Sequence, residues 1–141
     1  MKHVGGRAGR LHVLRLQPGE DVRATLAAWA QQHNIEAAGV VSAVGSLTHA
    51  HLRYANRADG IMTAADLEVC ALTGTVSMHG MHLHLSVADR DGHMLGGHML
   101  DGCLVRTTLE LVVQEVAEVT MVRIKDEQTG YDELDPRPLK P

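Results

Sequence analysis

The chain has 141 residues, 45% of them hydrophobic, and a formal net charge of -4, values that fit one domain with a real apolar core. Its 13 Lys and Arg residues form no run and aromatic residues make up only 2%, which disfavours both a basic nucleic-acid footprint and base stacking on aromatic platforms. No apolar run reaches the roughly 18 to 20 residues of a membrane helix and the first residues lack a signal peptide's apolar core, so we expect a soluble, cytoplasmic protein without a membrane partner.

The first half of the sequence predicts a strand, a helix and two further strands after an N-terminal extension, residues 1–8. Residues 10–16 alternate as in a strand, and residues 21–33 carry apolar side chains at helical spacing, with Trp29 expected in the core. Asn34 suits the helix exit. Residues 37–47 are rich in small and β-branched side chains, and residues 48–55 alternate between apolar and polar side chains. Each segment therefore predicts one strand.

The second half reads as a series of strands after a loop, residues 55–66. Gly and Asp signals separate the four expected strands, which are residues 67–77, 81–89, 93–100 and 103–116. Few connections are long enough for crossover helices, so the predicted fold is α+β: a single domain, residues 9–124, with a largely antiparallel sheet of about seven strands and one main helix. Three of the four prolines fall in residues 125–141, which predicts a flexible C-terminal tail.

The two cysteines are expected to be reduced structural thiols. Cys70 and Cys103 form no CxxC motif, and the apolar run around Cys70 predicts a small buried side chain.

Five of the ten histidines fall within residues 79–99. In a strand, His82 and His84 project from one face, because side chains alternate between faces. Whether His98 joins them depends on the turn between the two strands. A three-residue loop with Gly92 in the left-handed conformation places His84 opposite His98, whereas a two-residue turn moves His98 to the other face unless a bulge at Gly96-Gly97 restores the parity.

Three neutral imidazoles are a typical ligand set for Zn²⁺ or another divalent transition metal, with a fourth position open to water or a ligand. A metal-bound water would permit hydrolysis or lyase chemistry if a proton carrier lies in reach. The candidate carriers are Glu110, Asp89 and Asp101. The alternative is that these histidines are ordinary surface residues that bind no metal. We prefer this interpretation for a second HxH motif, His49 and His51, because no third ligand accompanies it.

Three segments resemble the plant and prokaryote conserved (PPC) domain family. The first, residues 82–105, resembles its central HxH strand, D-x-x-G turn and GGH strand; the second, residues 9–22, its opening strand; the third, residues 39–54, its small-residue block. The resemblance runs from about residue 9 to about residue 120 and implies a homotrimer, a metal on His82, His84 and His98, and backbone roles for Gly96 and Gly97 beside the site.

The resemblance also implies a partner-contact segment that opens with Gly9 and Arg10. Plant members bind the DNA minor groove through an AT-hook with an Arg-Gly-Arg-Pro core. Residues 5–10, Gly-Gly-Arg-Ala-Gly-Arg, have neither that Pro nor that order.

These features favour a metal-binding homotrimer that binds a small anionic ligand or a regulatory protein. The first alternative is a metal-dependent hydrolase or lyase, with Glu110 as the weak catalytic candidate. The second is a DNA-associated regulator in which a trimer gathers one basic patch from Arg10, Arg53, Arg57 and Arg106.

Overall fold

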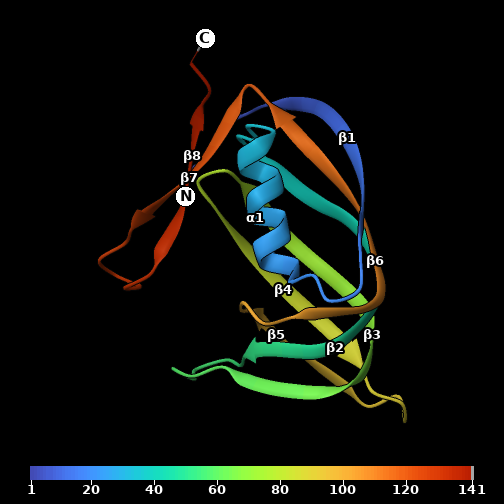
Figure 1. Ribbon diagram of the computed structural model, residues 1–141. Coiled ribbons are helices and arrows are strands. Elements are labelled where there is room, and N and C mark those ends of the chain that lie inside the picture. The colour runs from blue at the N-terminus through green and yellow to red at the C-terminus, as the bar shows by residue number, and fades with distance from the viewer. Residues whose placement is uncertain (141) are drawn as a thin grey trace.

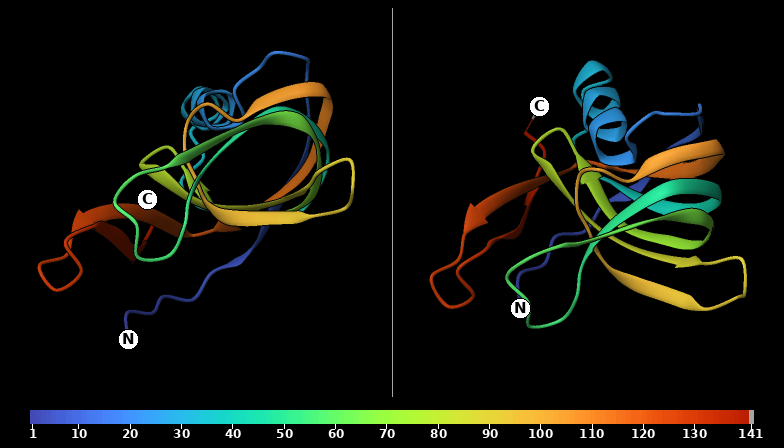
Figure 2. Two further views of the ribbon diagram at one scale, coloured as in Figure 1. Left: turned by 90° about the horizontal axis from the view of Figure 1, so that it is seen from below. Right: turned by 60° about the horizontal axis from the view of Figure 1, so that its bottom comes forward.

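A six-stranded antiparallel sheet dominates the computed structural model, which describes residues 1–140 (Figure 1). Its strand order is β1-β6-β2-β3-β4-β5, and β2 also pairs with β5, so the sheet curls back on itself (Figure 2). The six strands are β1 (Arg7–Leu16), β2 (Ala38–Arg53), β3 (Ile61–Ser77), β4 (Gly80–Ala88), β5 (Met94–Met99) and β6 (Leu104–Ala117). The inward side chains of the sheet build the apolar core, and the fold is the predicted α+β class.

The helix α1 (Val22–Gln32) confirms the helix predicted for residues 21–33. Its buried residues, Val22, Leu26 and Ala30, share one face and pack in the core. Asn34 follows the helix in the left-handed region, with φ of 51°, the conformation in which Asn often ends a helix. No helix in residues 1–140 is long and apolar enough to cross a membrane.

Asp21 caps α1 and also ties it to the β5–β6 connection. Its Oδ1 accepts the Ala24 amide at 3.0 Å and its Oδ2 accepts the Gly102 amide at 2.5 Å. Asp21→Ala should therefore lower the free energy of unfolding by about 0.5–2 kcal/mol, the usual contribution of such a cap. Urea denaturation at fixed protein concentration measures this change against Asp59→Ala, an exposed loop carboxylate. Equal effects of the two changes would contradict the prediction.

Two strand predictions differ from the structure. The two strands expected in residues 37–55 are one long strand, β2, whose register shifts at three points, so bulges bend it without ending it. The expected loop 55–66 is shorter, because β3 already begins at Ile61.

The prediction that Cys70 is buried was wrong. The register of β3 against β4 shifts between Val69 and Ala71, so Cys70 is the extra residue of a bulge and its side chain is exposed. Cys103 is buried, as expected of a small hydrophobic side chain, and both cysteines are free thiols.

The segment expected to be a flexible tail contains a strand. The strand β8 (Asp132–Pro138) pairs antiparallel with β7 (Val119–Lys125), and this two-stranded hairpin extends from one side of the curled sheet (Figures 1 and 2). Glu118 links β6 to the hairpin with φ of 69°, a left-handed conformation that turns the chain sharply.

Contacts to the sheet hold the root of the hairpin in place. The Met121 amide donates to the Glu36 carbonyl at 2.9 Å, and the Ser77 hydroxyl donates to the Met121 carbonyl at 2.7 Å. The Glu36 carboxylate accepts from Thr120 at 2.5 Å and contacts His79 at 2.9 Å. The Thr120 hydrogen bond is the main cause of a lowered Glu36 pKa. The hairpin is therefore fixed against the body of the protein.

Candidate metal centre

The β4–β5 hairpin brings three histidines to one face of the sheet. Asp89 and His93 close a three-residue loop, with the Asp89 amide donating to the His93 carbonyl at 3.0 Å, and Gly92 is left-handed with φ of 82°. His84 consequently lies directly opposite His98. The structure thus has the first of the two turn geometries compatible with the sequence. His82 joins the pair because it lies two residues before His84 on β4.

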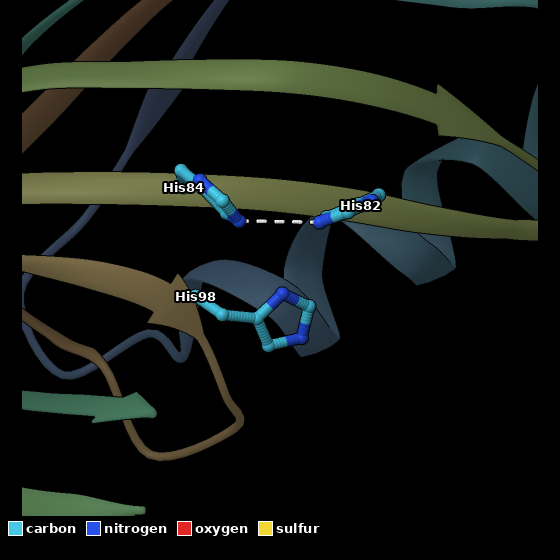
Figure 3. A group of neighbouring side chains, drawn as sticks. All are labelled: His82, His84 and His98. Carbon is cyan, nitrogen blue, oxygen red and sulfur yellow. Dashed lines mark hydrogen bonds between the residues drawn. The ribbon is translucent and has the colours of Figure 1, made fainter. Parts of the chain in front are cut away.

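The three imidazole rings converge on one point (Figure 3). Each ring offers a nitrogen, and these three atoms lie within 4.8 Å of one another. The Nε2 atoms of His82 and His84 are 3.2 Å apart. Zn–N bonds of about 2.0–2.1 Å in a tetrahedral site place ligand nitrogens about 3.3 Å apart. The side chains therefore fit a first-row metal ion, with further coordination positions toward solvent.

The surroundings keep two of the rings neutral. Burial is the largest cause that lowers the pKa of His98, to about 4, and the charges of His82 and Arg53 lower it further. Burial and the charge of His84 lower the pKa of His82. A metal ion binds neutral imidazole, so these shifts favour the ligand form at neutral pH.

The lowered pKa of His98 predicts an acid-sensitive metal-free protein. Between pH of about 6.5 and about 4, the unfolded chain binds a proton at this histidine while the folded chain does not. Stability should therefore fall as the pH decreases through that interval. Urea denaturation of the metal-free protein at pH 7 and pH 5 measures the loss, and His98→Gln should show a smaller one. An equal pH dependence in the two proteins would refute this origin.

The glycines beside the histidines permit close strand packing. A Cβ atom on Gly97 would lie 2.8 Å from the Arg53 carbonyl oxygen, and one on Gly96 would lie 3.4 Å from the Leu85 carbonyl oxygen. Gly97 in particular lets β5 approach the end of β2, where His98 lies opposite Arg53. Gly97 thus contributes to the position of His98, whereas a Cβ atom on Gly96 would make an ordinary van der Waals contact.

None of the three candidate proton carriers lines a cavity that the three histidines line. Glu110 lies on β6, opposite Arg15 of β1 and Val44 of β2. Asp101 forms an ion pair with Arg23 at 2.8 Å. Asp89 accepts hydrogen bonds within its own turn.

The remaining histidines have other contacts. His93 contacts Asp89 in the β4–β5 turn at 3.2 Å, and His79 contacts Glu36. In the second HxH motif, His51 contacts the Asp101 carbonyl through Nδ1 at 2.7 Å and His49 contacts Thr48. Neither His79 nor His93 belongs to the converging group, because His79 precedes β4 and His93 precedes β5.

Residues that the sequence analysis did not assign to the site also surround the histidines. A cavity of about 630 Å³ is lined by His82, His84 and His98 together with Arg53, Arg57 and Tyr131. A neighbouring cavity of about 250 Å³ shares His82, His98, Arg53 and Tyr131 and adds Arg23, Arg123, Asp132 and Glu133. The C-terminal hairpin, whose second strand lies in the segment predicted as a flexible tail, thus forms one wall of the site.

The sequence of the hairpin contains some features that are typical of strands and turns. Residues 119–125 are rich in β-branched side chains, as in a strand, and alternate apolar and polar except at Met121 and Val122. Gly130 is a turn signal before the next strand. The prolines and acidic residues around them dominated the composition and favoured a tail. Arg53 carried no such signal, because its neighbour β5 is distant in sequence.

The fold and the three converging histidines define a small, mainly antiparallel α+β domain with a candidate metal centre. The family model of the Plants and Prokaryotes Conserved (PCC) domain matches residues 3–117. The chain therefore belongs to this family. The β7–β8 hairpin lies beyond the matched residues.

Two curated relatives differ widely in their similarity to the chain. The bifunctional protein GlmU of Synechococcus sp. (strain JA-3-3Ab) is 43% identical over 125 residues, which cover 89% of this chain and 20% of GlmU. The AT-hook motif nuclear-localized protein 8 of Arabidopsis thaliana is 25% identical over 122 residues, covering 78% of this chain and 31% of that protein. The chain spans about a fifth of the length of the GlmU relative.

Two solved structures have the same fold over almost their whole length. A hypothetical protein from Salmonella cholerae-suis superposes with a TM-score of 0.92 and 44% identity, covering 96% of this chain and 98% of that one. A metal-containing protein from Archaeoglobus fulgidus superposes with a TM-score of 0.81 and 27% identity, covering 95% and 99%.

Proposed function

We propose that this protein is a metal-binding module in which His82, His84 and His98 hold zinc or another divalent transition metal. The observation that carries the proposal is the convergence of the three imidazoles, with two Nε2 atoms 3.2 Å apart. The Archaeoglobus fulgidus structure supports it, because that protein of the same fold contains metal. The open coordination positions would bind a small anionic ligand or a group of a regulatory partner. The predicted cytoplasmic location is part of this proposal.

We further propose that the module assembles as a homotrimer. Large apolar side chains are exposed on the edge strand β1 and on β2: Leu11 (63%), Val13 (81%), Val41 (59%) and Val44 (58%). Such a group on one sheet is typical of a protein interface. Gly9 and the exposed Arg10 precede Leu11 on β1, in keeping with the partner-contact role that the family resemblance implies. Size-exclusion chromatography with light scattering measures the assembly, and a monomer would refute it.

Elemental mass spectrometry on protein purified without a His-tag tests the metal proposal. We expect about one zinc or similar ion per chain, either as purified or after supplementation with Zn²⁺ and removal of the excess. His49→Ala, which changes the other HxH motif, serves as the control and should leave the content unchanged. Wild-type protein that holds no metal after supplementation would overturn the proposal.

The second candidate is a metal-dependent hydrolase or lyase. It is favoured by Glu133, a carboxylate that lines the same small cavity as His82 and His98 and was not among the predicted proton carriers. A metal would supply an activated water there. Zinc-dependent turnover of an ester or phosphoester that is lost in Glu133→Gln, with metal content retained, would support this candidate.

DNA association is the third candidate, and it comes from the similarity to the Arabidopsis AT-hook protein. Of the four arginines expected to form a basic patch, Arg53 and Arg57 line one cavity. Arg106 of β6 forms an ion pair with Asp66 of β3 at 3.0 Å, and Arg10 lies on β1. Retention on DNA with a steep salt dependence would support phosphate contacts. No retention at low salt would exclude them.

A further inference from the structure

We propose that the ligand of the metal centre is a small oxyanion, a carboxylate or phosphate group, and that Arg53 and Arg123 recognise it beside the histidines. This inference rests on the proposed metal-binding function and names the ligand chemistry of that site. Both arginines line the cavity of about 250 Å³ together with His82, His98 and Tyr131. Pockets for drug-sized ligands typically enclose about 300–1,000 Å³, so this volume suits a small molecule.

Strand register places Arg53 on the same face as the histidines. Residues directly opposite in antiparallel strands project to the same side. Arg53 lies opposite His98 across β2 and β5, and His98 lies opposite His84 across β5 and β4. The row of side chains therefore runs from the guanidinium through two of the three candidate ligands.

Arg123 reaches this face from the hairpin. Its Nη2 donates to the Thr75 hydroxyl at 2.8 Å, and Thr75 lies opposite His82 across β3 and β4. The charge of Arg123 contributes to the lowered pKa of His82, as that of Arg53 does at His98. The two guanidinium groups therefore approach the histidines from different elements.

Neither arginine forms an ion pair with a carboxylate among the described residues. In the part of the chain that the structure describes, neither Arg53 nor Arg123 has a carboxylate oxygen within 4.0 Å, although Asp132 and Glu133 line the same cavity. Arg23, the third arginine of the cavity, is paired with Asp101.

Arg123 is also partly removed from water. Its Nε atom is buried and has no hydrogen-bond acceptor among residues 1–140. Burial lowers the pKa of Arg123, and the charge of Glu133 opposes this shift only in part. An anion beside the guanidinium would offset the remaining cost of burial. This under-compensated charge is what a bound oxyanion would neutralise.

Arg53 is held in position by Tyr131 and keeps unpaired N–H donors. Its Nη1 donates to the Tyr131 hydroxyl at 2.9 Å, and its guanidinium carbon lies 5.0 Å from the centre of the Tyr131 ring. An arginine has five N–H donors in a planar fork that matches carboxylate and phosphate oxygens. Tyr131 thus orients the fork and leaves most of its donors free for an oxyanion.

Isothermal titration calorimetry tests the inference on the full chain, both metal-free and loaded with Zn²⁺. The probes are malonate, inorganic phosphate and the uncharged malonamide. We expect the zinc-loaded protein to bind malonate or phosphate and not malonamide, and the stronger anion identifies a carboxylate or a phosphate as the preferred group. Arg53→Gln and Arg123→Gln should each weaken that binding by about tenfold or more, with zinc stoichiometry unchanged.

The matched control is Arg90→Gln, which removes an exposed arginine from the β4–β5 turn and should bind the anion as the wild type does. Circular dichroism confirms the fold of each variant. If Arg123→Gln does not fold, Arg53→Gln alone decides whether an arginine recognises the anion. Zinc binding without anion binding, or anion binding unchanged in the folded arginine variants, would overturn the inference alone. Arginine-dependent anion binding by a protein that takes up no zinc would support the anion site and overturn the metal proposal.

Discussion

His84→Ala will abolish tight metal binding and leave the fold intact. His84 is the middle member of the histidine group, next to His82 on β4 and opposite His98 on β5. Its loss leaves two imidazoles, and we expect the zinc affinity to fall by more than about 100-fold, beyond the about 10–100-fold lost when a partner of a metal ligand is changed. Because the side chain is exposed and lies outside the core, the metal-free variant should unfold at nearly the wild-type temperature.

Competition with a chromogenic zinc chelator measures the affinity of His84→Ala, and circular dichroism measures its unfolding. His49→Ala is the control, since this histidine belongs to the other HxH motif and to neither group of side chains that could hold a metal ion. Wild-type affinity in His84→Ala would show that the three rings are not the ligands. Loss of both metal and fold would indicate a structural site instead of an open one.

Leu83→Ala should destabilise the protein strongly. Leu83 lies between the two histidines on β4 and points the opposite way, into the core, where it is 0% exposed. Removal of its side chain leaves a cavity in close-packed surroundings, so we expect the free energy of unfolding to fall by about 2–5 kcal/mol. Urea denaturation at one protein concentration measures this. Met94→Ala, a change at an exposed residue of β5, should alter stability by less than about 0.5 kcal/mol.

The pair of changes at positions 83 and 84 separates the two faces of one strand. A small effect of Leu83→Ala on stability, or an effect as large from His84→Ala, would contradict the alternation on which the site rests. Zinc added to folded Leu83→Ala should still bind, because the outward histidines keep their backbone positions.

Local patterns predicted much of the chain. The helix was predicted with its extent and its exit because the apolar spacing and Asn34 act over a few neighbouring residues. The β4–β5 hairpin was also local: Gly92 determines the loop, and the loop determines which residue faces His84. The outcome of the two turn geometries nevertheless needed the structure, since a change of one residue in the loop reverses every side chain of the strand.

Bulges limited the strand predictions. Cys70 was expected inside because its neighbours are apolar, but the extra residue of a bulge breaks the alternation and turns the side chain outward. Bulges also explain why the two strands expected in residues 37–55 form one strand, since they bend β2 without ending it. Such register shifts depend on the partner strand, which a single segment of sequence does not contain.

By itself the sequence determined the fold class, the helix, the histidine pair on one strand face and the family resemblance, because these depend on short-range periodicity and turn chemistry. Only the tertiary structure decided which residues surround that pair. It placed Arg53 beside His98 through the β2–β5 pairing, and it brought Arg123 from β7 and Tyr131 from the segment where a tail was expected. The physical reason is that pairing between distant strands and docking of the hairpin depend on contacts between segments far apart in the chain, which leave little trace in the local pattern of either segment.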